Sequence, residues 1–212
     1  MAARSKEITV ATIAVVAAVV SVYFAVAGRS EKVDLDTYSA LGAVSAEESA
    51  KLAGNKGQVV IMIPDSGPNK NPSVEAEVKA FEKIINRQKG MTAVVEKVGV
   101  TAMTMMATGG GVPPEQFFKG LEKHKGAAVL ALFFVFPDLA TADLDRFKQY
   151  RLKTLVISSF RSTYKTLCDQ GAIQIVISPR QDTPPENPPQ AKTVRERFDQ
   201  DFSIITPEES HR

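Results

Sequence analysis

The amino-acid sequence predicts an α/β protein: a three-layer α/β/α sandwich around a five-stranded, mainly parallel sheet of order 2-1-3-4-5, preceded by one transmembrane helix. Three observations predict it. Short apolar runs alternate with amphipathic segments from residue 57 onward, as in βαβ units. The runs are apolar without alternation, which suits strands buried on both faces. An uncharged apolar segment near the N-terminus has about the length that spans a bilayer.

The N-terminal apolar segment, residues 8–27, predicts a single-pass anchor in the cell (inner) membrane. Arg4, Lys6 and the free amino terminus precede it, and this positive bias favours a cytoplasmic N-terminus and an extracytoplasmic, periplasmic domain. Ala25 and Ala27 also form an A-x-A pattern that signal peptidase could cleave. Cleavage near Ala27 would give a secreted or periplasmic protein, so both interpretations export the chain.

The domain organisation follows from changes in composition along the chain. Residues 1–28 form the transmembrane helix or signal anchor, and residues 29–56 are interpreted as a stalk or linker. Ser45 is expected to cap a short helix at 46–53 within this linker. Residues 57–178 form the α/β domain. Residues 179–212 form a proline-rich linker and C-terminal tail, whose helical piece and terminal strand at 202–206 can fold back on the domain.

The sheet is expected to contain the five apolar runs, at 59–63, 92–98, 127–136, 154–158 and 173–177. Between them, helical spacing of apolar residues predicts helices at 73–88, 114–123, 139–150 and 162–170. Because connections between parallel strands are right-handed, these units are expected to stack in the order 2-1-3-4-5.

Charge and residue usage exclude several function classes. Only two basic residues and one acidic residue precede Gly28, out of 26 basic and 24 acidic residues, so the exported part is nearly neutral and no nucleic acid partner is expected. The single Cys168 is predicted to be buried. His124 and His211 are the only histidines, and the GxSxG and HExxH motifs do not occur, so we expect no enzyme, no metal and no cofactor. The methionines at 103, 105 and 106 are interpreted as apolar filler.

Polar residues follow several of the predicted strands. In an open parallel sheet, ligands bind at the carboxyl ends of the strands, near the point where the strand order reverses. Asp138 is alternatively the cap of the helix at 139–150, and the three glycines at 109–111 form either a flexible loop or an anion-binding turn. The candidate ligand-binding residues are Asp65, Ser66, Asn69, Asp138, Ser159 and Arg180.

The order of elements carries a family resemblance. The strand VVIMI, the loop DSGPNKNP, the helix SVEAEVKAFEKIINRQKG and the strands TAVVEKV, AAVLALFFVFPD and RLKTLVISS follow one another. This layout resembles the N-terminal lobe of type I periplasmic sugar-binding proteins, within the wider group of flavodoxin-like folds. The resemblance implies binding of a small polar solute. Unlike those proteins, the chain is too short for a second comparable lobe.

These observations together predict a membrane-anchored extracytoplasmic α/β domain that acts as a non-enzymatic binding or sensing module. One alternative is a solute-binding component, for a sugar-like ligand, of a transport or receptor system that a protein partner or a dimer completes. A second alternative is an uncharacterised hydrolase that uses Asp65 or Asp138.

Overall fold

The computed structural model describes residues 34–65, 67, 71–158, 164–181 and 190–207 of the 212-residue chain. The chain divides into two units at Asp34, and the fold described below belongs to the second, Leu35–Arg212. The predicted transmembrane segment at 8–27 lies outside the described residues. Within them, no helix has both the length and the apolar character needed to cross a membrane.

The described strands form one mainly parallel sheet in the order β2-β1-β3-β4-β5-β6. The predicted order of the first five strands is confirmed, but the sheet has six strands rather than five. The sixth comes from the C-terminal tail and pairs antiparallel with β5, with Ile177 opposite Ile204. The strands are β1 (Gly57–Asp65), β2 (Met91–Gly99), β3 (Val129–Leu132), β4 (Lys153–Ile157), β5 (Ile175–Pro179) and β6 (Phe202–Ile205).

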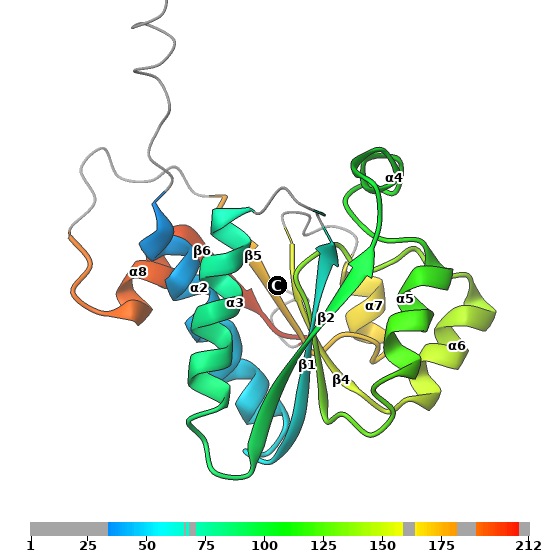
Figure 1. Ribbon diagram of the computed structural model, residues 1–212, viewed down its shortest axis with the longest axis horizontal. Coiled ribbons are helices and arrows are strands. Elements are labelled where there is room, and N and C mark those ends of the chain that lie inside the picture. Colours follow the sequence, from blue (N-terminus) through cyan, green and yellow to red (C-terminus); the bar gives the residue numbers. More distant parts are fainter. Residues whose placement is uncertain (1–33, 66, 68–70, 159–163, 182–189, 208–212) are drawn as a thin grey trace, which may run out of the picture. The chain divides into compact units, whose positions relative to one another are not determined.

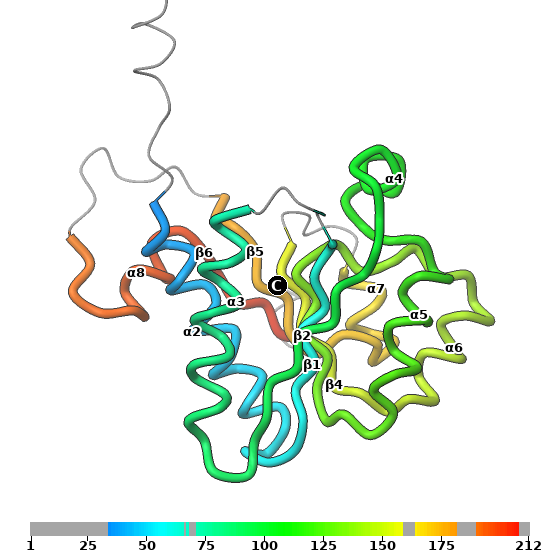
Figure 2. Tube along the Cα trace, viewed as in Figure 1, coloured from blue at the N-terminus to red at the C-terminus, as the bar shows by residue number. Residues whose placement is uncertain are grey.

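Helices cover both faces of this sheet, as the sandwich prediction requires (Figures 1 and 2). One layer contains α2 (Leu35–Leu52), α3 (Pro72–Ile85) and α8 (Val194–Asp201), and the other contains α5 (Pro114–Glu122), α6 (Thr141–Gln149) and α7 (Tyr164–Asp169). Successive side chains of a strand point to opposite faces. Val59 and Ile61 of β1 therefore join the core under α2 and α3, while Val60 and Met62 join the core under α5.

The segment interpreted as a stalk is largely part of the packed domain. Helix α2 runs from Leu35 to Leu52, so it begins well before the predicted short helix at 46–53. Ser45, the expected cap, lies inside the helix, and its hydroxyl donates to the Leu41 carbonyl at 2.7 Å. The buried face of α2 is rich in alanine, and Gly42 packs directly against the backbone of Glu77 in α3. Such small residues give little hydrophobic contrast, which explains why the sequence pattern suggested a linker.

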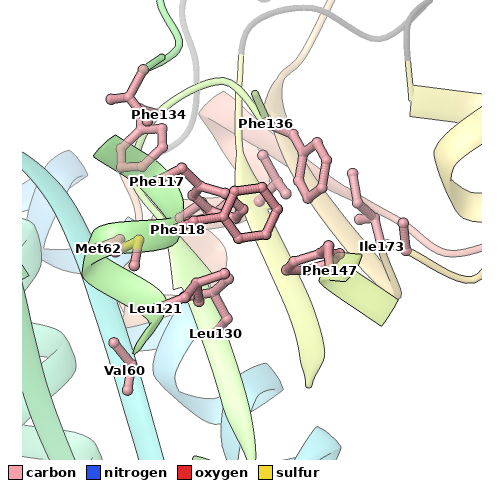
Figure 3. Packing of buried hydrophobic residues seen from close by; sticks show 14 of the residues in the cluster. Val60, Met62, Phe117, Phe118, Leu121, Leu130, Phe134, Phe136, Phe147 and Ile173 are labelled. Atoms are coloured by element: carbon pink, nitrogen blue, oxygen red, sulfur yellow. The ribbon is translucent and has the colours of Figure 1, made fainter. Parts of the chain in front are cut away.

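Phenylalanines fill the core between the sheet and α5 to α7 (Figure 3). Phe117 lies 5.9 Å from Phe136 and 5.6 Å from Phe147 between ring centroids. Phe136 follows β3, which ends at Leu132 rather than at the predicted residue 136. Phe134 and Phe136 leave the sheet because their rings are buried against the helices instead.

The short helix α4 (Ala102–Ala107) follows β2 and lies at the end of the sheet toward which the strands point (Figure 1). Its Met103 and Met106 are 81% and 83% exposed, so their interpretation as apolar filler is wrong. Six residues form less than two helical turns, and none of them is buried. In contrast, Cys168 on α7 is buried as predicted, and burial raises the pKa of its thiol, with a further contribution from Asp169.

Candidate ligand-binding edge of the sheet

The carboxyl ends of β1, β3, β4 and β5 lie at one edge of the sheet, because these strands are parallel. Strand order reverses beside β1, which places the candidate edge at the loops after β1 and β3. Of the predicted site residues, Asp65, Asp138 and Arg180 can be located. Ser66, Asn69 and Ser159 lie outside the described residues.

Asp65 is the last residue of β1 and pairs with Gly99 of β2 in the sheet register. Its side chain is exposed, and its Oδ1 accepts a hydrogen bond from the Gly67 amide at 3.1 Å. At the other end of the same loop, Asn71 Oδ1 accepts from the Ser73 amide at 3.0 Å and caps α3. Asp65 and Asn71 thus each accept a hydrogen bond from a nearby backbone amide at an end of this loop, and the Asp65 side chain remains exposed.

Asp138 follows β3, the strand that pairs with β1, and Met62 lies opposite Leu132 in this pair. It is exposed, and the preceding Pro137 is buried. The prediction that Asp138 caps the next helix is wrong, since α6 begins at Thr141 and its N-cap, Ala140, makes no side-chain cap. Asp65 therefore ends β1, and Asp138 lies in the segment that follows the adjacent strand β3, without a capping role.

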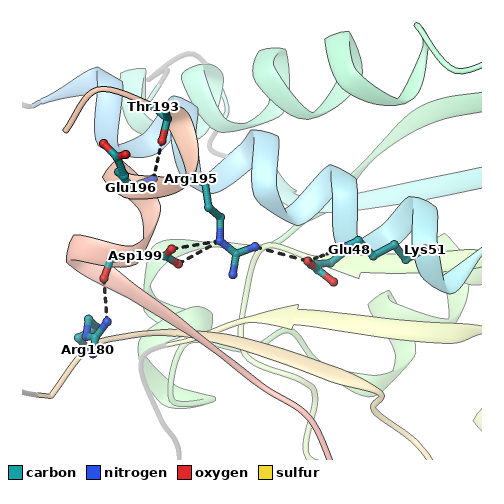
Figure 4. A network of polar contacts seen from close by, with 7 residues as sticks. All are labelled: Glu48, Lys51, Arg180, Thr193, Arg195, Glu196 and Asp199. Carbon is teal, nitrogen blue, oxygen red and sulfur yellow. Dashed lines mark hydrogen bonds and ion pairs between the residues drawn. The ribbon is translucent and has the colours of Figure 1, made fainter.

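Arg180 is engaged elsewhere. Its Nη1 donates to the Asp199 carbonyl at 2.8 Å, and its backbone amide donates to the Asp201 carbonyl at 2.8 Å (Figure 4). These bonds attach the end of β5 to α8. Arg180 also follows a strand three positions from β1, which corresponds to roughly 14 Å across a sheet with a strand spacing of about 4.8 Å. The structure groups it with the C-terminal tail and not with the two carboxylates.

The glycine-rich loop after α4 packs against the segment that follows β3. Gly110 has a φ of +92°, and its carbonyl accepts from the Val135 amide at 3.3 Å. A Cβ at Gly111 would lie 3.2 Å from the Val135 carbonyl oxygen. Close backbone approach therefore accounts for glycine here, and the alternative of an anion-binding turn receives no support from this contact.

A buried tyrosine behind the edge was not predicted. Tyr164, the first residue of α7, is only 3% exposed, and its hydroxyl lies beside the Ser158 side chain and the Phe136 backbone. Burial raises the pKa of Tyr164, and these two neighbours oppose the shift in part. Tyr164 thus lies close to Phe136, after β3, and Ser158, after β4. Its helical spacing in the sequence gave no sign of this position.

A second polar cluster joins β2 to α5. Glu96 accepts from Lys123 Nζ at 2.6 Å, and its other oxygen lies 3.0 Å from His124 Nε2. Burial favours the neutral form of Glu96, but its hydrogen bonds with Lys123 and His124 outweigh this effect and lower its pKa. Lys123 and His124 lie 27 and 28 positions after Glu96 in the sequence, so no local motif could reveal the cluster. Across the described residues, no group of three or more His, Cys, Asp and Glu is arranged to hold a metal ion.

No protein-family model matches the chain, and no curated protein matches its sequence. Solved structures do match the fold. GanP, a glucose-galactose binding protein from Geobacillus stearothermophilus, aligns with a TM-score of 0.53 at 13% identity, over 82% of this chain and 61% of that one. AraP, an arabinose binding protein from the same organism, gives 0.52 at 13% identity, over 82% and 62%.

A LacI transcriptional regulator from Bacteroides fragilis gives a TM-score of 0.51 at 11% identity, over 81% of this chain and 60% of that one. The chain thus spans about three fifths of the length of these proteins. At such identities the match concerns the fold, and it confirms the predicted resemblance to a lobe of the periplasmic-binding-protein type.

Proposed function

We propose that the chain is a membrane-anchored, extracytoplasmic and non-enzymatic binding or sensing module. The observation that carries this proposal is the match of four fifths of the chain to the fold of sugar-binding proteins such as GanP. In an open parallel sheet, ligands are bound at the carboxyl edge. In this chain that edge presents the exposed carboxylates Asp65 and Asp138.

A role in recognition fits the chemistry of these two residues better than hydrolysis does. Catalytic carboxylates usually owe their reactivity to burial or to a close charged neighbour, whereas Asp65 and Asp138 are both exposed. Exposed carboxylates on adjacent loops can accept hydrogen bonds from the hydroxyl groups of a polar solute. The third candidate, Arg180, is bonded to α8 and is assigned to the attachment of the tail.

The more specific candidate is a solute-binding component for a sugar-like ligand, completed by a dimer or a partner chain. It is supported by the match to the fold of sugar-binding proteins, and this chain spans 61% of GanP. A small-molecule site buries most of its ligand in a cleft, and two lobes supply more surface than one. A second chain facing the carboxyl edge would supply such additional surface.

Thermal shift measurements on the full chain in uncharged detergent test this proposal. We expect monosaccharides at millimolar concentration to raise the melting temperature, with the ligand-dependent stabilisation that mass action requires. Asp65→Asn should reduce the shift, while the control Asp145→Asn, on the outward side of α6, should leave it unchanged. An equal response of both variants, or hydrolysis of ester substrates that depends on Asp65, would contradict the proposal.

The membrane topology is tested separately. We expect a C-terminal alkaline phosphatase fusion to be active and a C-terminal fluorescent-protein fusion to be dark in a bacterial host, because the domain is proposed to be extracytoplasmic. Replacing Val15 and Val19 by lysine should release the chain from the membrane fraction, since charges in the apolar segment oppose insertion. A membrane-free chain before this change would contradict the anchor.

A further inference from the structure

A groove of about 860 Å³ is lined by residues of the layer that contains α2, α3 and α8, and neither Asp65 nor Asp138 is among them. Its walls come from the first half of α2, the second half of α3 and the segment that leads into α8. Nothing in the proposed solute site uses this groove.

The charges around the groove have one predominant sign. Lys83 lies near the end of α3 and Arg87 just after it, while Lys192 lies just before α8 and Arg197 within it. Among the described residues that line the groove, Asp36 is the one acidic side chain. The chain as a whole is nearly neutral, so this excess arises because the fold brings together cations that are about 110 positions apart in the sequence.

The more deeply buried lining of the groove, its floor, is apolar. Ala40 and Ala43 of α2 are buried, and Ala80 and Ile84 of α3 are half-buried, whereas Lys83, Arg87 and Lys192 are exposed. A cationic rim around an apolar floor complements an amphiphilic anion, which has a charged head and apolar neighbouring atoms. A free inorganic anion would use the rim and gain nothing from the floor.

The wall that α8 contributes is held in place by hydrogen bonds and ion pairs (Figure 4). Thr193 is the N-cap of α8, and its Oγ1 accepts from the Glu196 amide at 3.1 Å, while the Glu196 carboxylate accepts from the Lys192 amide at 2.7 Å. Arg195 contacts Glu48 of α2 at 3.7 Å and Asp199 at 3.1 Å. The backbone that carries Lys192 and Arg197 is therefore fixed relative to α2.

The groove also lies close in sequence to the predicted membrane anchor. Asp36 and Ser39 line it, and nine positions separate Asp36 from Ala27, the end of the apolar segment. An extended chain of nine residues spans at most about 30 Å. With the anchor of the proposed function in place, this short connection tethers the domain that carries the groove to the membrane, so lipid headgroups are ligands within its reach.

From charge, apolar floor and chain length, we infer that this groove binds the headgroup of an anionic phospholipid in the membrane to which the chain is attached. Lys83, Arg87, Lys192 and Arg197 would contact the phosphate, and the alanine-rich floor would contact the glycerol and the first acyl carbons. The inference rests on the membrane attachment proposed above and is independent of the solute site.

The test uses the full chain in uncharged detergent and two short-chain lipids. We expect dioctanoyl phosphatidylglycerol to raise the melting temperature and to bind saturably, and dioctanoyl phosphatidylcholine to do neither. Basic residues near an anionic lipid surface each contribute roughly a fivefold gain in affinity. The double variant Lys83→Gln/Arg87→Gln should therefore weaken binding of phosphatidylglycerol roughly 25-fold.

The matched control is Lys79→Gln/Lys165→Gln, which removes two exposed cations that do not line the groove. It should change the affinity less than twofold, and Asp65→Asn should not change it at all. Equal binding of both lipids, an equal effect of the control pair, or equal stabilisation by inorganic phosphate would each overturn the lipid assignment. Unchanged melting of the lipid-free variants establishes that they are folded.

Discussion

At the scale of single residues, the buried carboxyl group of Glu77 should make the stability of the fold depend on pH. It is 8% exposed in the interface between α2 and α3, and burial raises its pKa to about 8 from an ordinary value of 4.5. The folded state therefore holds a proton that the unfolded state loses above pH 4.5. Stability from this group is complete below pH 4.5 and falls as the pH rises toward 8.

Glu77→Gln should remove most of this pH dependence, because the amide resembles the protonated acid. At pH 7 the penalty in the wild type is on the order of 3 kcal/mol, which corresponds to roughly 6–12 °C in melting temperature for a domain of this size. Thermal unfolding of both proteins from pH 4.5 to 8 measures the difference. Parallel curves for the two would show that Glu77 ionises without cost in the fold.

Glu96 should behave in the opposite way. Its pKa is lowered, since its hydrogen bonds with Lys123 and His124 outweigh burial. It therefore contributes stability above the unfolded pKa, and this contribution is lost as the pH falls through the lower folded value. Glu96→Gln should destabilise the protein at pH 7 and become nearly neutral in strong acid. A variant that is equally destabilised at both pH values would contradict the ionic role.

Some residue-level features were predictable from the sequence, and others required the fold. Cys168 was predicted to be buried because it lies at helical spacing from Tyr164 and no basic residue or histidine flanks it, and it is buried. The exposure of Met103 and Met106 was missed, since an apolar side chain in the sequence is normally assigned to a core. The predicted cap at Asp138 was wrong by two residues, because the N-cap of α6 is Ala140 and the helix begins at Thr141. Helix ends are decided by local backbone geometry, which composition alone does not specify.

At the scale of elements, glycine controls how closely helices approach. A Cβ at Gly42 would overlap the carbonyl oxygen of Glu77, so α2 and α3 are in direct backbone contact. A Cβ at Gly120 of α5 would instead meet the flexible end of Met62 at 2.8 Å. Backbone cannot move without shifting a helix, whereas a methionine side chain can rotate away.

Gly42→Ala should thus destabilise the protein by about 2 kcal/mol or more, even though alanine favours a helix by about 1 kcal/mol over glycine. Gly120→Ala should cost less, because Met62 adapts and the helix gains from alanine. Urea unfolding of the two variants beside the wild type measures both effects. If Gly120→Ala were the more damaging change, the contact of α2 with α3 would not be as close as described.

The predicted bounds of helices and strands were accurate where the periodicity of apolar residues is strong, and inaccurate where it is weak. Helix α3 alternates apolar and charged residues clearly, and its predicted range of 73–88 includes nearly all of Pro72–Ile85. Helix α2 was taken for a linker, since alanine, serine and glycine bury its face without a hydrophobic stripe. The run that contains β3 was predicted to be too long, because the phenylalanines after Leu132 are apolar but belong to the packing of α5 and α6.

At the scale of the whole molecule, the strand order could be derived because right-handed crossovers allow few arrangements. The sequence did not determine whether the C-terminal tail folds back on the domain. The structure shows that it does, as strand β6 paired with β5. The groove between α2, α3 and α8 could not be derived at all. It depends on the fold placing Lys83 and Lys192 in the lining of one groove, and both lie in locally mixed charge patterns.

The extent of the folding unit gives the last prediction. Sequence composition alone placed the start of the domain at residue 57, but α2 covers the sheet face that includes Val59, Ile61 and Val129, all fully buried. A chain that starts at Leu35 should therefore unfold cooperatively, while one that starts at Lys56 should expose this face, bind hydrophobic dyes and aggregate. Exposing apolar surface to water costs about 25 cal/mol per Å². Exposing roughly 400 Å² would therefore cost about 10 kcal/mol, as much as the total stability of a typical domain. Calorimetry of both chains measures the difference. A cooperative transition in the shorter chain would contradict the inclusion of α2 in the folding unit.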